Sequence, residues 1–174
     1  MKIRYFALLA VVMPMMSACF GKVPPSAQEV CGSNIFNFHG NDQPLGDGRR
    51  LEEEIRNAAA AGAPTTLGDI TRSAGWSDNW DRMVEVYPDE KIDRLNSDAQ
   101  TDLPERCWQG LPHRRDWDDP SVGYYLFLSN GRPVQAVEWD GYEQPPLSRY
   151  RKISPLTPLS TLVVDKDGNL IPAD

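Results

Sequence analysis

Two β-rich runs joined by a tight-turn dipeptide constrain the fold more than any other feature of the sequence. The runs occupy residues 122–139, VGYYLFLSNGRPVQAVEW, and flank Asn130-Gly131. Asn-Gly is the preferred dipeptide of a two-residue hairpin, because that turn requires positive φ angles. Tyr124 to Leu128 is apolar on both faces, as expected of a strand in the middle of a sheet. The sequence therefore predicts a central antiparallel hairpin.

Two helices are predicted ahead of this hairpin. The first lies in residues 46–64, GDGRRLEEEIRNAAAAGAP, where Asp47 can cap the start and Gly62 can end the helix. The second lies in the next stretch, TTLGDITRSAG, where Thr66 and Asp69 have the spacing of a capping box.

A strand and a further short helix are predicted between these helices and the hairpin. The alternation in WSDNWDRMVEVYP places Trp80, Val84 and Val86 on one face of a strand that Pro88 ends. Residues 89–100 then favour a short helix.

The rest of the chain supplies a loop and a second hairpin. Residues 101–121 show no periodicity and predict a long polar loop, tied down by Cys107 and Trp108. Asp167-Gly168 marks a turn inside STLVVDKDGNLIP. Together the elements indicate an α+β fold, with an antiparallel sheet of about four strands and the N-terminal helices packed on one face.

Residues 1–18 have the anatomy of an export signal. Lys2 and Arg4 precede an apolar stretch at residues 5–16, and small residues follow it. The stretch is shorter than the roughly 20 apolar residues that span a bilayer, and Pro14 interrupts it. The pattern favours an exported protein over a membrane-spanning helix.

The signal ends on the sequence MSAC at residues 16–19, which resembles a bacterial lipobox. In such signals the peptide before the cysteine is removed, and the cysteine receives lipid. We therefore expect a signal peptide at residues 1–18, palmitate-type lipid on Cys19, a tether at residues 19–30 and a single α+β domain at residues 31–174. An ordinary secretory signal cut near Ala18 is the alternative.

The charge balance of the exported chain is strongly acidic. Lys2 and Arg4 are two of the 18 basic residues, and none of the 25 acidic residues lies in the signal, so 16 basic residues stand against 25 acidic ones, a formal charge of −9. Nucleic acids and anionic lipid surfaces both reward basic patches. The composition therefore argues against nucleic acid as a partner, and membrane association is expected through the lipid alone.

Cys31 and Cys107 are expected to form a disulfide, because an exported chain meets an oxidising environment. Two separate buried thiols are the alternative. His39 and His113 are the only histidines, and no metal-ligand spacing occurs around them. Pairing Cys31 with His39 as nucleophile and base fits cysteine usage outside the cytoplasm less well than the disulfide does.

Enzyme signatures are absent from the sequence, so no catalytic residue, metal or other cofactor is predicted. DKDGN at residues 165–169 resembles a calcium loop only briefly, because its glycine is fourth, whereas the EF-hand glycine is sixth. We interpret this segment as a hairpin turn.

A charged loop is the one candidate recognition site. The sequence HRRDWDDP contains Arg114, Arg115, Trp117 and Asp118 without apolar neighbours. A tryptophan in such a loop can anchor a protein partner. A solvated loop with local ion pairs is the plainer interpretation.

The other tryptophans lie at strand or strand-edge positions of the expected fold, where packing in the core is the default. They are Trp76, Trp80, Trp108 and Trp139. A carbohydrate-binding platform of exposed rings is the alternative.

Residues 76–140 resemble a group of uncharacterised bacterial lipoproteins. The likeness lies in NWDRMVEVYPDEKIDRL and YYLFLSNGRPVQAVEW, and the matching positions are Trp80, Asp81, Arg82, Pro88, Leu126, Phe127, Gly131 and Val134. The long insertion around Cys107 departs from the pattern of that group. The resemblance implies a location and a fold, and it implies no reaction.

We therefore expect a lipid-anchored accessory module on the outer face of a bacterial membrane, which binds another envelope protein. An immunity or inhibitor lipoprotein acting on an exported toxin or enzyme is one alternative, since an acidic domain suits a basic target. An envelope enzyme is the other alternative.

Overall fold

A computed structural model describes residues 26, 30–114, 122–140, 147 and 155–173 of the 174-residue chain. A three-stranded antiparallel sheet lies at the centre, in the order β3-β5-β6. Its strands are β3 (Arg82–Val86), β5 (Val122–Ser129) and β6 (Arg132–Asp140). The expected signal peptide, Cys19 and almost all of the expected tether lie outside the described residues.

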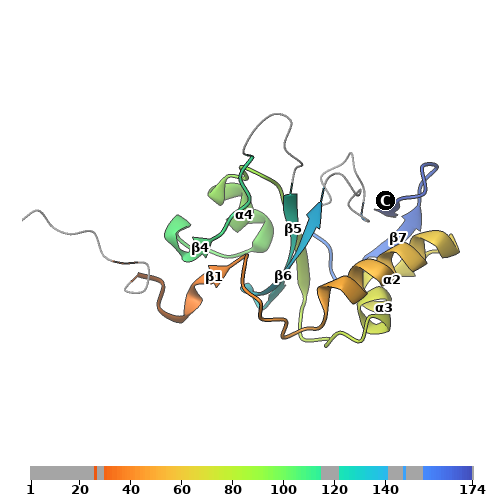
Figure 1. The fold of residues 1–174 in the computed structure, drawn as a ribbon, viewed down its shortest axis with the longest axis horizontal. Coiled ribbons are helices and arrows are strands. Elements are labelled where there is room, and N and C mark those ends of the chain that lie inside the picture. Colours follow the sequence, from red (N-terminus) through yellow and green to blue (C-terminus); the bar gives the residue numbers. More distant parts are fainter. Residues whose placement is uncertain (1–25, 27–29, 115–121, 141–146, 148–154, 174) are drawn as a thin grey trace, which may run out of the picture.

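Helices flank this central sheet on two sides (Figure 1). On one side are α2 (Gly48–Ala61) and α3 (Leu67–Ser73), and on the other is α4 (Ile92–Ala99). The α+β class is therefore confirmed.

The central hairpin is confirmed at its predicted turn. Asn130 and Gly131 both have positive φ angles, 51° and 71°, and Ser129 pairs with Arg132 across the turn. The register then shifts by one residue opposite Phe127 and Leu128. The shift occurs beside Pro133, which has no amide hydrogen to donate to a ladder.

The first two helices begin at their predicted caps. The Asp47 carboxylate accepts a hydrogen bond from the Arg49 amide at 2.9 Å, and Gly62 ends α2 with a φ angle of 70°. The Thr66 hydroxyl accepts from the Asp69 amide at 3.1 Å at the start of α3. Local polar spacing was sufficient to place both helix starts.

The strands of the described residues form three sheets, of two, three and three strands, and not one sheet of about four. The second hairpin, β7 (Thr161–Val164) with β8 (Leu170–Pro172), pairs with the two-residue strand β2 (Thr65–Thr66) and not with β3. The outer side of β3 instead bridges Leu156, whose amide donates to the Met83 carbonyl at 2.9 Å.

Trp80 lies on the opposite side of the central sheet from the one predicted. Val84 and Val86 pack towards α4, whereas Trp80 packs with Met83 and Phe127 in the core beneath α2 and α3. The strand begins only at Arg82, so the alternation of the strand does not extend back to Trp80.

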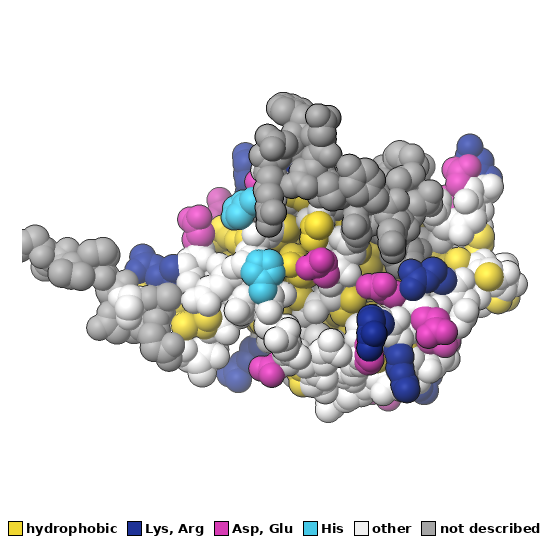
Figure 2. Space-filling model, viewed as in Figure 1, with side chains coloured by type: hydrophobic (Ala, Val, Ile, Leu, Met, Phe, Trp, Pro, Cys, Tyr) yellow, Lys and Arg dark blue, Asp and Glu magenta, His cyan; other side chains and the backbone are white. Residues whose placement is uncertain are grey.

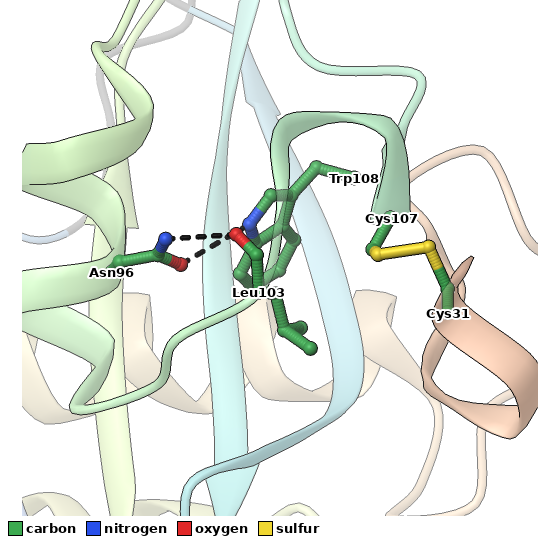
Figure 3. Close-up of a disulfide and its surroundings, with 5 residues drawn as sticks. All are labelled: Cys31, Asn96, Leu103, Cys107 and Trp108. Atoms are coloured by element: carbon green, nitrogen blue, oxygen red, sulfur yellow. Dashed lines mark hydrogen bonds between the residues drawn. A yellow bond between two sulfur atoms is a disulfide. The ribbon is translucent and has the colours of Figure 1, made fainter. Parts of the chain in front are cut away.

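The predicted polar loop after α4 contains ordered structure (Figure 3). It includes a short 3-10 helix, Glu105–Cys107, and the strand β4 (Trp108–Gln109). The Asn96 side chain donates to the Leu103 carbonyl at 2.8 Å and accepts from the Trp108 indole at 3.2 Å. Cys107 and Trp108 do tie this loop down, as expected.

Two hydrophobic cores lie against the two faces of the central sheet. The larger contains Leu51 and Ile55 of α2, and the smaller contains Leu95 and Ala99 of α4. Trp76, Trp80, Trp108 and Trp139 are all buried, with exposed fractions of 5, 4, 5 and 5 %. The interpretation of these four rings as an exposed carbohydrate platform is therefore wrong.

Within the described ranges, none of the helices is both long and apolar enough to cross a membrane.

Candidate functional site

A disulfide joins Cys31 to Cys107, which ends the short 3-10 helix after α4 (Figure 3). The two α-carbons are 5.7 Å apart, and the residues are 76 positions apart in sequence. The predicted pairing is confirmed. Cys31 therefore has no free thiol to act as a nucleophile with His39.

The residues after each cysteine continue this attachment. The strand β1 (Phe36–Asn37) pairs in parallel with β4, and the Phe38 amide donates to the Gln109 carbonyl at 2.9 Å. The Phe38 ring lies 5.1 Å from the Tyr124 ring, measured between centroids. The disulfide and this pairing thus hold the segment that carries His39 against β5.

An open cleft of about 270 Å³ lies between this segment, the start of α2 and strand β6. Figure 2 shows a face of the molecule on which histidine, acidic and basic side chains lie around exposed hydrophobic area. The cleft is lined by side chains and backbone of Phe38, His39, Gly40, Asn41, Gln43, Gly48, Arg49, Glu52, Tyr124, Ala136, Val137 and Glu138.

Three polar side chains form a hydrogen-bonded chain along one wall of the cleft. The Tyr124 hydroxyl lies 3.1 Å from His39 Nδ1 and donates to Glu138 Oε2 at 3.1 Å. A hydroxyl has one hydrogen, so His39 must be the donor to the Tyr124 oxygen. This arrangement assigns the proton of neutral His39 to Nδ1.

Burial, followed by the nearby Glu138 carboxylate, raises the pKa of Tyr124 well above its usual value. The hydroxyl therefore stays protonated at neutral pH and keeps its donor role. Tyr124 fixes the Glu138 side chain through one oxygen. The second oxygen, Oε1, has no hydrogen-bond partner among the residues that the structure describes.

The opposite wall is the first turn of α2. Arg49 lies 3.7 Å from the Asp47 carboxylate, and Glu52 lies 3.8 Å from Arg56. The side chain of Gln135 in β6 contacts the residues just before α2. Its Oε1 accepts a hydrogen bond from the Leu45 backbone amide at 2.9 Å, and its Nε2 donates to the Gly46 carbonyl at 2.8 Å. The cleft is therefore built from residues distant in sequence.

A second acidic group, Glu85, is buried in the core and not in the cleft, with 2 % of its surface exposed. It lies opposite Tyr125 in the register of β3 and β5. Burial, and then the Glu85 charge, raises the pKa of Tyr125 and of Tyr87. The sequence pattern did not single out Glu85, because an acidic residue inside a strand usually faces solvent.

The predicted recognition loop falls mostly outside the described residues. Arg115, Trp117 and Asp118 lie there, whereas Arg114 is described and exposed. The neighbouring His113 contacts Asp89 through Nδ1 at 3.3 Å. Arg114 does not line the cleft.

Metal-ligating residues are not clustered: across the described ranges, no group of three His, Cys, Asp or Glu side chains could hold an ion. The calcium-like segment is a hairpin turn, as interpreted, because Asp165 Oδ1 accepts from the Asp167 and Asn169 amides at 2.9 Å each.

Neither a protein-family model, nor a curated protein, nor a solved structure matches this chain.

Proposed function

We propose that this protein is an exported binding module, anchored by lipid on Cys19 to the outer face of a bacterial membrane. The observation that carries the proposal is the Cys31–Cys107 disulfide. Structural disulfides persist in oxidising compartments outside the cytoplasm. Cys31 follows Cys19 by 12 residues, so the bonded domain would begin close to the anchor and to the membrane surface.

The cleft supports binding as the activity of this module. His39, Tyr124 and Glu138 are hydrogen-bonded to one another, and Glu138 Oε1 has no partner among the described residues, so it can accept a hydrogen bond from a partner molecule. Cys31 is bonded to Cys107 and has no thiol to act as a nucleophile, and His39 Nδ1 is hydrogen-bonded to Tyr124. These two residues therefore do not form a nucleophile–base pair.

Replacement of Cys19 tests the anchor. The full chain and its Cys19→Ser variant are expressed in a bacterium with labelled palmitate, and membrane and soluble fractions are compared. The natural chain should carry label and sediment with membranes, and the variant should lose both properties while remaining folded. A matched Cys31→Ser/Cys107→Ser variant should still be labelled. Membrane association of the unlabelled Cys19→Ser variant would contradict the proposal.

The partner is proposed to be another envelope protein, contacted by the cleft or by the loop that contains Arg114, Arg115, Trp117 and Asp118. Cross-linking in intact cells followed by mass spectrometry identifies it. Comparing the natural chain with Trp117→Ala and with Glu138→Gln assigns the partner to one surface. If the natural chain captures no protein, that result would contradict a protein-binding role.

A second candidate is an immunity or inhibitor lipoprotein, which the charge of −9 on the exported chain favours. An acidic surface accelerates association with a basic toxin or enzyme. Protection of cells from a toxin encoded beside this gene, lost when the gene is deleted, would support this function over the accessory role.

A further inference from the structure

Among the strands that the structure describes, β6 lies at an edge of the central sheet. Its only ladder partner in the described part of the chain is β5, whereas the opposite edge strand, β3, bridges Leu156. Beyond the bulge beside Pro133, pairing with β5 runs without interruption from Gln135 to Asp140. An edge strand directs alternate N–H and C=O groups outward, where they can pair with another extended chain.

The cleft opens onto this edge. Along β6, the side chains of Ala136 and Glu138 lie on one face of the sheet, and the side chain of Val137 between them lies on the other face. All three line the same cleft, which must therefore extend around the strand edge. The edge position of β6 in the described sheet and the cavity are two separate observations that coincide on the same residues.

The connection before α2 bounds the cleft and remains exposed. Phe38 packs in the core on one face of the sheet and Leu45 in the core on the other, so the chain between them crosses beside the edge of β6. Asn41, Asp42 and Gln43 are all exposed. The edge is thus bordered by a solvent-exposed segment, and none of the described strands pairs with it.

Charge selects the kind of chain that fits. Glu138 Oε1 faces no partner of the described chain, while Tyr124 fixes the same carboxylate through Oε2. The single guanidinium of the cleft lining, Arg49, already lies 3.7 Å from Asp47. A lysine or arginine of an incoming chain would complement Glu138. A second copy of this acidic chain would place Glu138 near another acidic surface.

We propose that β6 and the cleft bind an extended, basic peptide segment of a partner protein, which adds a strand to the central sheet and places a lysine or arginine beside Glu138. Backbone pairing supplies affinity, and the Glu138 carboxylate supplies the preference for a basic side chain. This inference rests on the proposed role as a binding module, but it does not depend on the lipid.

The test uses the purified exported protein and a synthetic peptide that alternates lysine with threonine and is about as long as β6. Calorimetric titration gives affinity, and hydrogen exchange maps the site. Binding should slow exchange of amides within residues 135–140, and N-methylation of alternate peptide amides should weaken binding by at least roughly tenfold, because it removes the strand-pairing donors. Substituting glutamate for the peptide lysines should abolish binding.

Glu138→Gln should weaken binding of the lysine peptide roughly twofold to fivefold, as expected for loss of one exposed charge pair. The matched control is Glu53→Gln, which removes an equal charge from an exposed position of α2 outside the cleft and should leave affinity unchanged.

Three results would overturn the proposal. They are no binding of the lysine peptide, equal binding of its N-methylated form, and self-association of the protein through β6 in place of peptide binding. Each leaves the Cys19 experiment unaffected, so failure of this inference is distinguishable from failure of the proposed anchoring.

Discussion

The indole of Trp139 lies directly over the α-carbon of Gly123, its partner across the β5–β6 ladder. A β-carbon at Gly123 would be only 2.1 Å from Trp139 Cζ2. The ring thus fills the space that a side chain at residue 123 would take. Tyr87 also contacts Trp139, with ring centroids 5.6 Å apart, so this pair fixes the end of the hairpin next to β3.

Gly123→Ala should therefore destabilise the fold by about 1 to 3 kcal/mol, because the tryptophan must move in a filled core. Denaturant unfolding measures the change. Gly168→Ala, at a turn with no atom near the added methyl group, separates backbone strain from steric displacement. Unchanged stability of Gly123→Ala would contradict the steric explanation.

Removing the disulfide should cost about 4 kcal/mol, as the chain-entropy model gives for a loop of this length. The Cys31→Ser/Cys107→Ser variant should also show faster hydrogen exchange at β1, because that strand has only two paired residues. Reductant should destabilise the natural protein and leave the variant unaffected. Unchanged unfolding of the natural protein in reductant would argue against the bond.

Gln135→Met should destabilise the domain by about 2 to 5 kcal/mol, since it leaves the Leu45 amide and the Gly46 carbonyl without their partner. The side chain of Gln109 is exposed, and Gln109→Met is the corresponding control. Thermal unfolding of both variants decides the point; a neutral Gln135→Met would show that water satisfies these groups.

Tyr124→Phe should free His39 from its fixed tautomer at a cost in stability of about 1 kcal/mol. Nitrogen chemical shifts of the imidazole should report Nδ1–H in the natural protein and a mixture in the variant. Tyr125→Phe removes a hydroxyl from the opposite face of β5, where it contacts Leu147, and should leave the His39 spectrum unchanged. An unaltered tautomer in Tyr124→Phe would contradict the hydrogen-bonded chain.

Stability should fall as the pH rises above about 10, the usual tyrosine pKa. Burial, with Glu85 or Glu138 nearby, raises the pKa of Tyr87, Tyr124 and Tyr125 in the folded protein. The unfolded chain then loses these protons first, so the stabilisation is complete below the unfolded pKa and is lost above it. The free energy of unfolding across this range, together with tyrosinate absorbance, checks the sign. Tyr124→Phe should reduce the slope.

Local features of the sequence determined the ends of the elements. Two helices begin at the caps Asp47 and Thr66, and the central hairpin turns at Asn130-Gly131. These features depend on contacts within a few residues, so they can be predicted from the sequence alone. The Cys31–Cys107 bond was also predictable, because only those two cysteines remain if Cys19 carries lipid.

The pairing register of β5 and β6 determines which side chains meet in the cleft. An unbroken ladder from the Ser129–Arg132 pair would place Val137 opposite Tyr124, but the bulge at Pro133 moves Glu138 there. A single-residue shift exchanges the two faces of a strand, and without it the Tyr124 hydroxyl would not meet a carboxylate. The disulfide and the β1–β4 pairing then bring His39 to the same place. These contacts join residues 14 and 85 positions apart, so they arise only when the whole chain packs.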